Sequence, residues 1–192
     1  MKRKTLLVLA ILTLFISLAF GLNSDGKVKA STAAGNLAAT TKLSFPLADE
    51  TEALLLSCMD FRLVNATAKY MNKRGLLGEY DHVILAGASL GATSEKVPAW
   101  NTTFWEHLEV AIELHRIQKV IILDHKDCGA YRKLLGEEAV NTPEKELAEH
   151  EKHLIQLRDE IKKKYPRLEV ETLIMNLKGK VEPLPAVEKK AA

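Results

Sequence analysis

The chain has 192 residues, of which 47% are hydrophobic and 27% are charged. This composition is typical of a globular protein rather than of a disordered chain, and the length suits one domain. The formal net charge is +2, but residues 1–30 hold five Lys or Arg and one Asp or Glu, so the remainder carries 22 − 24 = −2. Without a surplus of positive charge, the composition argues against nucleic-acid binding.

The first thirty residues have the pattern of an export signal. A basic start, MKRK, is followed by the uncharged apolar run TLLVLAILTLFISLAF and by the small residues Gly21 and Ala30. This order predicts a signal peptide over residues 1–30; an uncleaved membrane anchor is the alternative, because the run is near the roughly 18 residues that a span needs. In either case we expect the rest to be exported, periplasmic or secreted. Residues 31–50, rich in Ala, Ser and Thr, predict a flexible linker to a domain over residues 51–185.

The first half of the predicted domain contains two strands and two helices. The apolar run 53–57 is typical of a buried parallel strand, and a helical stretch follows it. A second strand, 82–85, leads into the small-residue loop AGASLGA. Thr103 and Glu106 form a capping box that predicts the start of a helix, 103–115.

The second half repeats the alternation. The apolar run 119–124 predicts a third strand, which turns through HKDCGAYRKLL into another helix. A long amphipathic helix is expected between Pro143 and Pro166, then a last strand, 168–177, and a short return, 179–184. Apolar strands that alternate with helices indicate an α/β fold with a small, mostly parallel sheet of about four to five strands, in the order 2-1-3-4, flanked by helices.

Three potential metal ligands follow the ends of two strands. Cys58 comes directly after the first strand, and His125 and Cys128 come directly after the third. In the predicted order these strands are neighbours, so the three side chains should converge at the carboxyl edge of the sheet, where such folds bind ligands. One imidazole and two thiolates form a typical zinc set with an open fourth position. A Cys58–Cys128 disulfide is the alternative in an exported protein.

Two motifs carry a resemblance to a known family. The first is Cys58-Met59-Asp60-Phe61-Arg62, and the second is His125-Lys126-Asp127-Cys128-Gly129, with Ala86-Gly87-Ala88 between them. Together they resemble the β-class carbonic anhydrases, over about residues 50–182 of this chain. The resemblance implies a Zn²⁺-dependent reversible hydration of CO₂ to bicarbonate by a zinc-bound hydroxide, and a homodimer or higher homo-oligomer.

The resemblance also implies roles for individual residues. Cys58, His125 and Cys128 would hold Zn²⁺, which makes hydroxide available near neutral pH. Asp60 would orient that hydroxide, or swing onto the metal as a conditional fourth ligand, and Arg62 would keep Asp60 ionised. The residues expected at the substrate pocket are Gly87, Ala88 and Gly129.

The chain departs from the family pattern at three places. Asp124 stands where a glycine usually precedes the metal-binding histidine, Phe61 replaces a serine, and Ile84-Leu85 replaces Arg-Asn. Two other functions therefore stay open: hydrolysis of carbonyl sulfide or carbon disulfide, and zinc binding without turnover. The Asp60–Arg62 pair favours an enzyme, because a protein that only binds zinc does not need it.

Several other polar and aromatic residues are interpreted as structural. The HxxH pair His150 and His153 is expected on a half-solvated helix face rather than in a second metal site. Trp100 and Trp105 are expected in the core or in a dimer contact. His82 and His107 are likewise assigned structural roles.

Overall fold

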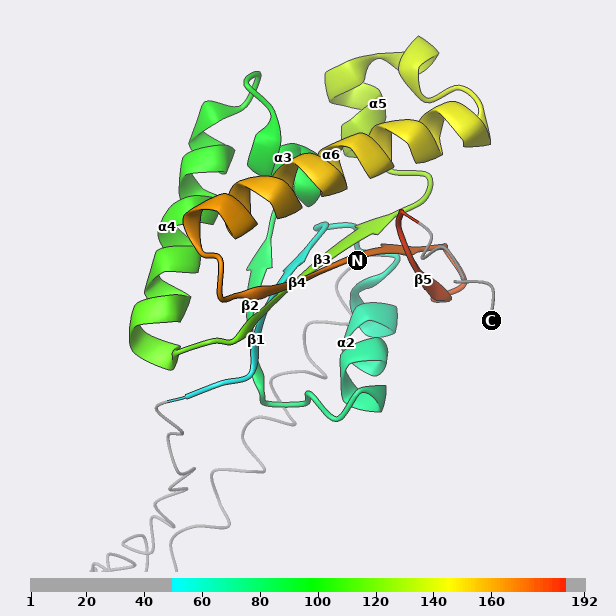
Figure 1. The fold of residues 1–192 in the computed structure, drawn as a ribbon. Helices are drawn as coiled ribbons and strands as arrows, with labels where there is room; N and C mark the ends of the chain where they lie inside the picture. The colour runs from blue at the N-terminus through cyan, green and yellow to red at the C-terminus, as the bar shows by residue number, and fades with distance from the viewer. Residues whose placement is uncertain (1–49, 186–192) are drawn as a thin grey trace, which may run out of the picture. The chain divides into compact units, whose positions relative to one another are not determined.

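The computed structural model describes residues 50–185 (Figure 1). The predicted signal peptide and nearly all of the predicted linker lie outside these residues. Within the described range, no helix combines the length and the apolar character needed to cross a membrane. The strands are β1 (Ala53–Ser57), β2 (Tyr80–Ile84), β3 (Lys119–His125), β4 (Glu169–Met175) and β5 (Val181–Pro183). The helices are α2 (Val64–Lys73), α3 (Ser89–Thr93), α4 (Pro98–His115), α5 (Gly129–Leu135), the 3₁₀ turn η1 (Glu137–Ala139) and α6 (Pro143–Lys164).

The five strands form one sheet in the order β2-β1-β3-β4-β5. The first four are parallel, and β5 runs antiparallel to β4. This arrangement confirms the predicted α/β fold and strand order. In β1, every residue is buried, as expected for a central strand covered on both faces. Because Ser57 pairs with Leu123, the ends of β1 and β3 lie side by side.

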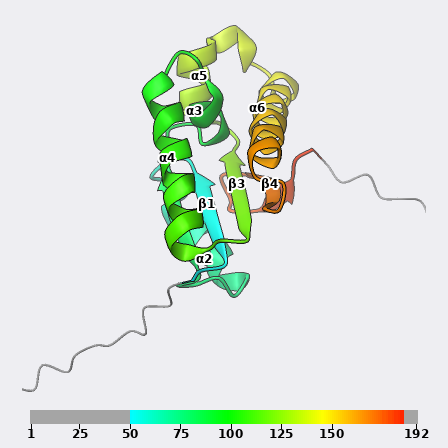
Figure 2. The same ribbon diagram turned by 60° about the vertical axis from the view of Figure 1, so that its left-hand side comes forward.

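Helices cover both faces of the sheet (Figures 1 and 2). On one face, Leu54, Leu56 and Ile122 join a core cluster with residues of α4 and α6. On the other face, Leu55 and Ile121 pack in a second cluster with Met71 of α2. The alternation of side chains along β1 and β3 therefore divides the apolar core between two layers of helix.

Two local predictions are wrong. Helix α4 begins at Pro98 rather than at Thr103, and the Thr103 hydroxyl donates to the carbonyl of Ala99 within the helix, so it caps nothing. A proline at the first helical position loses no intrahelical hydrogen bond, which makes Pro98 a suitable start. His150 and His153 are buried rather than half-solvated, because each bonds to a partner from another element.

The other aromatic residues that were expected to be structural differ in their surroundings. Trp105 packs against the core, whereas Trp100 is 36% exposed. His82 hydrogen-bonds Ser57 on the neighbouring strand, and the His107 ring bonds the carbonyl of Thr103 one turn earlier. These contacts give both histidines local partners inside the fold.

Candidate functional site

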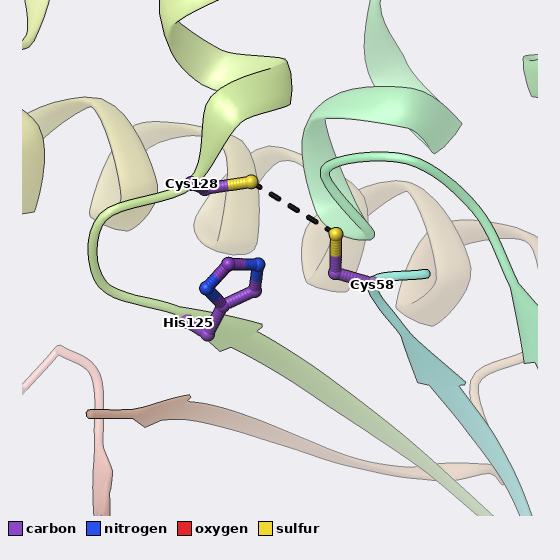
Figure 3. A group of neighbouring side chains, drawn as sticks. All are labelled: Cys58, His125 and Cys128. Carbon is purple, nitrogen blue, oxygen red and sulfur yellow. Dashed lines mark hydrogen bonds between the residues drawn. The ribbon is translucent and has the colours of Figure 1, made fainter. Parts of the chain in front are cut away.

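The three predicted metal ligands lie together at the carboxyl edge of the sheet (Figure 3). Cys58 follows β1, His125 ends β3, and Cys128 stands at the N-cap of α5. One ligand atom from each lies within 4.8 Å of the others, and the two sulfur atoms are 3.9 Å apart. The adjacency of β1 and β3 produces this convergence, since both strands end at the same edge.

The donor set of this cluster fits Zn²⁺. His125 and Cys128 are buried and Cys58 is partly buried. The Nδ1 atom of His125 lies 2.9 Å from the carbonyl oxygen of Lys126, and its Nε2 atom is buried with no hydrogen-bond partner among the described residues. A carbonyl that fixes one imidazole nitrogen and leaves the other free is the usual arrangement of a zinc-binding histidine. Two sulfurs and one such nitrogen satisfy the chemistry of a three-ligand zinc site.

The two cysteines are both free thiols in the structure. The hydrogen bond from Cys128 lowers the pKa of Cys58, against the effect of burial, and the Gly87 N–H and His125 act in the same direction. The pKa of Cys128 is raised by its hydrogen bond to Cys58 and by burial. Burial opposes the charged form of His125, but Cys58 outweighs it and raises the pKa of the ring. Because the two thiols share one hydrogen bond, the first proton is lost from the pair rather than from one identifiable cysteine.

Asp60 and Arg62 form a two-pronged ion pair beside the cluster. Arg62 Nε donates to Asp60 Oδ1 at 2.9 Å, and Arg62 Nη2 donates to Asp60 Oδ2 at 2.7 Å. The hydrogen bond from Arg62 lowers the pKa of Asp60 to about 2, so the carboxylate is ionised at neutral pH. Asp60 Oδ2 lies 3.8 Å from His125 Nε2. In this structure Asp60 is held by Arg62 at the edge of the three-ligand cluster.

Asp127 and Glu146 also shape the site, and the sequence reasoning missed both. Arg62 Nη1 donates to Asp127 Oδ2 at 2.7 Å, and Nη2 donates to the Asp127 carbonyl at 2.8 Å. Glu146, in the first turn of α6, accepts from the backbone N–H groups of Asp127 at 2.5 Å and Cys128 at 3.4 Å. The available signal for Asp127 was its place between two predicted ligands, with Arg62 in the turn after the adjacent strand. The sequence contains no comparable signal for Glu146.

The predicted substrate-pocket residues lie around Cys58 and Cys128. Gly87 N–H donates to Cys58 Sγ at 3.3 Å, Ala88 is buried next to it, and Gly129 opens α5 directly after Cys128. The cavity that Cys58 and His125 line has a volume of about 10 Å³, which is room for one water, and none of these three residues lines it. A larger hollow of about 440 Å³ lies by Gln118, before the start of β3, away from the cluster. The pocket assignment stays a prediction.

Asp124, the first departure from the family pattern, is buried with four hydrogen-bond donors around it. Ser89 contributes its N–H and hydroxyl, Tyr131 its hydroxyl, and His150 its Nδ1. Burial disfavours the carboxylate, but His150 and the other donors outweigh it and lower the pKa of Asp124. Phe61, the second departure, is 86% exposed; in the third, Ile84 is 53% exposed and Leu85 is partly buried against the core.

Comparison with known proteins places this site in a family context. A family model described as "Putative carbonic anhydrase" matches residues 48–185. An uncharacterized protein of Rickettsia conorii is 46% identical over 134 residues, which cover 70% of this chain and 72% of that protein. An uncharacterized protein of Rickettsia bellii is 44% identical over 134 residues, covering 70% and 82%.

Solved structures with a similar fold include two carbonic anhydrases. One, from Glaciozyma antarctica, is 19% identical, with 73% of this chain and 86% of that chain covered and a TM-score of 0.47. The other is the Coccomyxa β-carbonic anhydrase in complex with acetazolamide, at 13% identity, 96% and 87% coverage and a TM-score of 0.48. The assignment rests on the family model and the sequence relatives: the chain belongs to the carbonic anhydrase family that this model describes.

Proposed function

We propose that the protein binds Zn²⁺ through Cys58, His125 and Cys128 and catalyses the reversible hydration of CO₂ to bicarbonate. The observation that carries this proposal is the cluster of three ligand atoms within 4.8 Å, next to a carboxylate that Arg62 fixes. Zinc at such a site lowers the pKa of water, so that hydroxide is available near neutral pH. The residues of the chain then have to hold, orient and shield the reacting groups.

Asp60 is suited to orient the attacking water rather than to remove its proton. With a pKa of about 2, its carboxylate is too weak a base for proton transfer at neutral pH. It is a permanent hydrogen-bond acceptor, and its position is fixed by the fork of Arg62. Arg62 in turn is anchored to Asp127, in the turn between His125 and Cys128. This ties the orienting group to the ligand turn itself.

A second candidate function is zinc binding without turnover. The small cavity of about 10 Å³ beside Cys58 and His125 favours it, because it offers room for about one water. Hydrolysis of carbonyl sulfide or carbon disulfide uses the same attack and is tested on the same sample.

The test is a stopped-flow CO₂ hydration assay on the zinc-loaded, reduced full chain. Asp60→Asn should keep zinc and lose most turnover, and Cys58→Ser should lose zinc and turnover together. Asp81→Asn is the matched control, because Asp81 lies on the edge strand β2, away from the cluster, and pairs with His115 of α4. This variant should keep both zinc and turnover. Full zinc occupancy without CO₂ turnover between pH 6 and 9 would reject the proposal. Turnover of carbonyl sulfide alone would then assign the hydrolase.

We also propose that the protein is a homo-oligomer and is exported. Met59 and Phe61 are 65% and 86% exposed, and within residues 50–185 the outer edge of β2 pairs with no other strand, so a second copy can cover both. Light scattering that gives a monomeric mass would contradict the first proposal. Cell fractionation with N-terminal sequencing tests the second, and recovery of an uncleaved chain in the cytoplasm would contradict it.

A further inference from the structure

The buried carboxylate of Asp124 joins three separate elements. It lies on β3 directly before His125, and its side chain has no exposed surface. Ser89 N–H and Oγ donate to it at 3.0 and 2.7 Å, Tyr131 Oη at 2.7 Å and His150 Nδ1 at 2.8 Å. A buried carboxylate is costly unless donors surround it, and here Oδ1 accepts one hydrogen bond and Oδ2 accepts three. Asp124 thus connects β3 to the first residue of α3, to α5 and to α6.

Two of these elements, α3 and α5, adjoin the metal cluster. Ser89 follows Gly87 by two residues, and Gly87 N–H donates to Cys58 Sγ at 3.3 Å. Tyr131 lies three residues after Cys128, in the first turn of α5. The two segments also touch, since a Cβ added at Gly87 would lie 3.2 Å from the Cβ of Ala130. The position of each segment therefore affects the other.

Both segments contain backbone conformations that need outside support. Ala88 has φ 41° and ψ −101°, and Asp127 has φ 58°. An alanine adopts such a conformation only where the surrounding structure fixes it, whereas aspartate tolerates a positive φ more readily. Ala88 lies between Gly87 and Ser89, so the bonds from Ser89 to Asp124 secure the strained residue. Asp127 is secured by Arg62 and Glu146.

Helix α6 contributes two anchors that are one turn apart. Glu146 accepts the backbone N–H groups of Asp127 and Cys128, and His150 donates to Asp124. The rings of Tyr131 and His150 are also in contact, with centroids 3.9 Å apart and planes tilted by 40°. The helix thus holds the end of β3 on one side and the ligand turn on the other.

We propose that Asp124 and His150 are positioning residues of the metal centre. Through Ser89 they keep the Gly87 N–H directed at Cys58 Sγ, and through Tyr131 they keep Cys128 within reach of Cys58 and His125. This inference rests on the part of the proposed function that places a metal at the cluster, and not on turnover. It gives a purpose to the residue that replaces the glycine of the family pattern.

The test measures the metal centre directly in the reduced full chain. Asp124→Asn keeps the side-chain shape but turns an amide N–H₂ toward groups that are themselves donors. Its Zn²⁺ affinity, from competition with a chromophoric chelator, should fall roughly 10- to 100-fold, as for other residues that hold metal ligands in place. The thiolate-to-metal charge-transfer band of the Co²⁺-loaded variant should shift. Glu171→Gln is the matched acid-to-amide control, because it breaks a two-pronged ion pair with Arg74 away from the cluster.

Ser89→Ala covers the case in which Asp124→Asn does not fold. It removes one donor and keeps the backbone N–H, so a several-fold loss of Zn²⁺ affinity and a smaller shift of the band are expected. Unchanged affinity and an unchanged band in the folded variants would overturn the proposal, as would equal effects in Glu171→Gln. A wild-type chain that binds no metal would overturn both this inference and the proposed function. A chain that binds metal as described but lacks CO₂ hydration would contradict only the proposed function.

Discussion

Removal of the Tyr131 hydroxyl should destabilise the fold by about 2 kcal/mol. The side chain is fully buried, and its Oη donates to Asp124 Oδ2 at 2.7 Å and lies 3.0 Å from Ser89 Oγ. Tyr131→Phe keeps the ring and its packing, so the change is confined to the hydrogen bonds. A hydrogen bond to a charged group contributes about 1.5–3 kcal/mol, and three donors stay on Asp124, so about 2 kcal/mol is expected. For a domain of this size the melting temperature should fall by about 6 °C.

The assay is urea unfolding of the metal-free, reduced chain, since bound metal would add its own stabilisation. Tyr80→Phe is the control: it removes the same atom from a partly buried ring whose hydroxyl has no hydrogen-bond partner in the described part of the chain. That variant should differ from wild type by less than about 0.5 kcal/mol. A loss below about 0.5 kcal/mol for Tyr131→Phe, or equal losses for both variants, would refute the account of the Asp124 network.

Three further predictions follow from other parts of the fold. Burial disfavours the Glu171 carboxylate, but its interactions with Arg74 and Lys119 outweigh burial and lower the pKa of Glu171 from its ordinary value of 4.5. Glu171 therefore stabilises the fold above pH 4.5, and this contribution is lost as the pH falls through the lowered pKa. Glu171→Gln should therefore be less stable than wild type at pH 7 in urea unfolding, with the difference closing at acid pH; a constant difference would contradict this. Because Cys58 Sγ and Cys128 Sγ are 3.9 Å apart, oxidised dithiothreitol should convert the metal-free chain to a disulfide, with loss of both thiols in a thiol titration, while zinc-loaded protein stays reduced. Equal oxidation of the two forms would argue against metal at the sulfurs. Gly91→Ala, in α3, places a Cβ 2.7 Å from the Ala86 carbonyl oxygen and should cost about 1–3 kcal/mol by thermal melting. Gly129→Ala meets no atom within 4 Å and should stay near wild type; equal stabilities of the two variants would show that the backbone at Ala86 moves aside without cost.

The sheet was predictable because its central strands are buried on both faces. Apolar runs at 53–57 and 119–124 have no polar alternation, and in the structure they are the central strands β1 and β3. The helix boundaries were harder to predict. A threonine three residues before a glutamate also occurs inside helices, where the hydroxyl bonds the carbonyl four residues earlier, as Thr103 does with Ala99.

The buried histidines show where hydrophobic periodicity along a helix fails to predict burial. His150 and His153 occupy helix positions that face the core, and polar residues there suggest solvent exposure. Their partners, Asp124 and Thr93, are 26 and 60 residues away in the chain. A hydrogen bond across such a separation satisfies a buried polar group, but it leaves no mark on the local pattern.

The candidate metal centre also contains some residues that were predictable from the sequence and others that were not. Cys58, His125 and Cys128 were predictable because metal ligands need particular residue types at strand ends. Glu146 was not, because it acts on backbone N–H groups, which every sequence contains. The support of a site by α6 depends on how the helix packs, and the packing is set by the whole core.

The central claim is that two sulfurs and one imidazole bind zinc. X-ray absorption at the zinc edge of the reduced, zinc-loaded chain tests it most directly. One zinc per chain is expected, with two sulfur neighbours at about 2.3 Å and nitrogen or oxygen neighbours at about 2.0 Å. Cys58→Ser should lose one sulfur neighbour or the metal itself. A zinc ion surrounded only by nitrogen and oxygen, or a chain that binds no zinc with both thiols reduced, would contradict it.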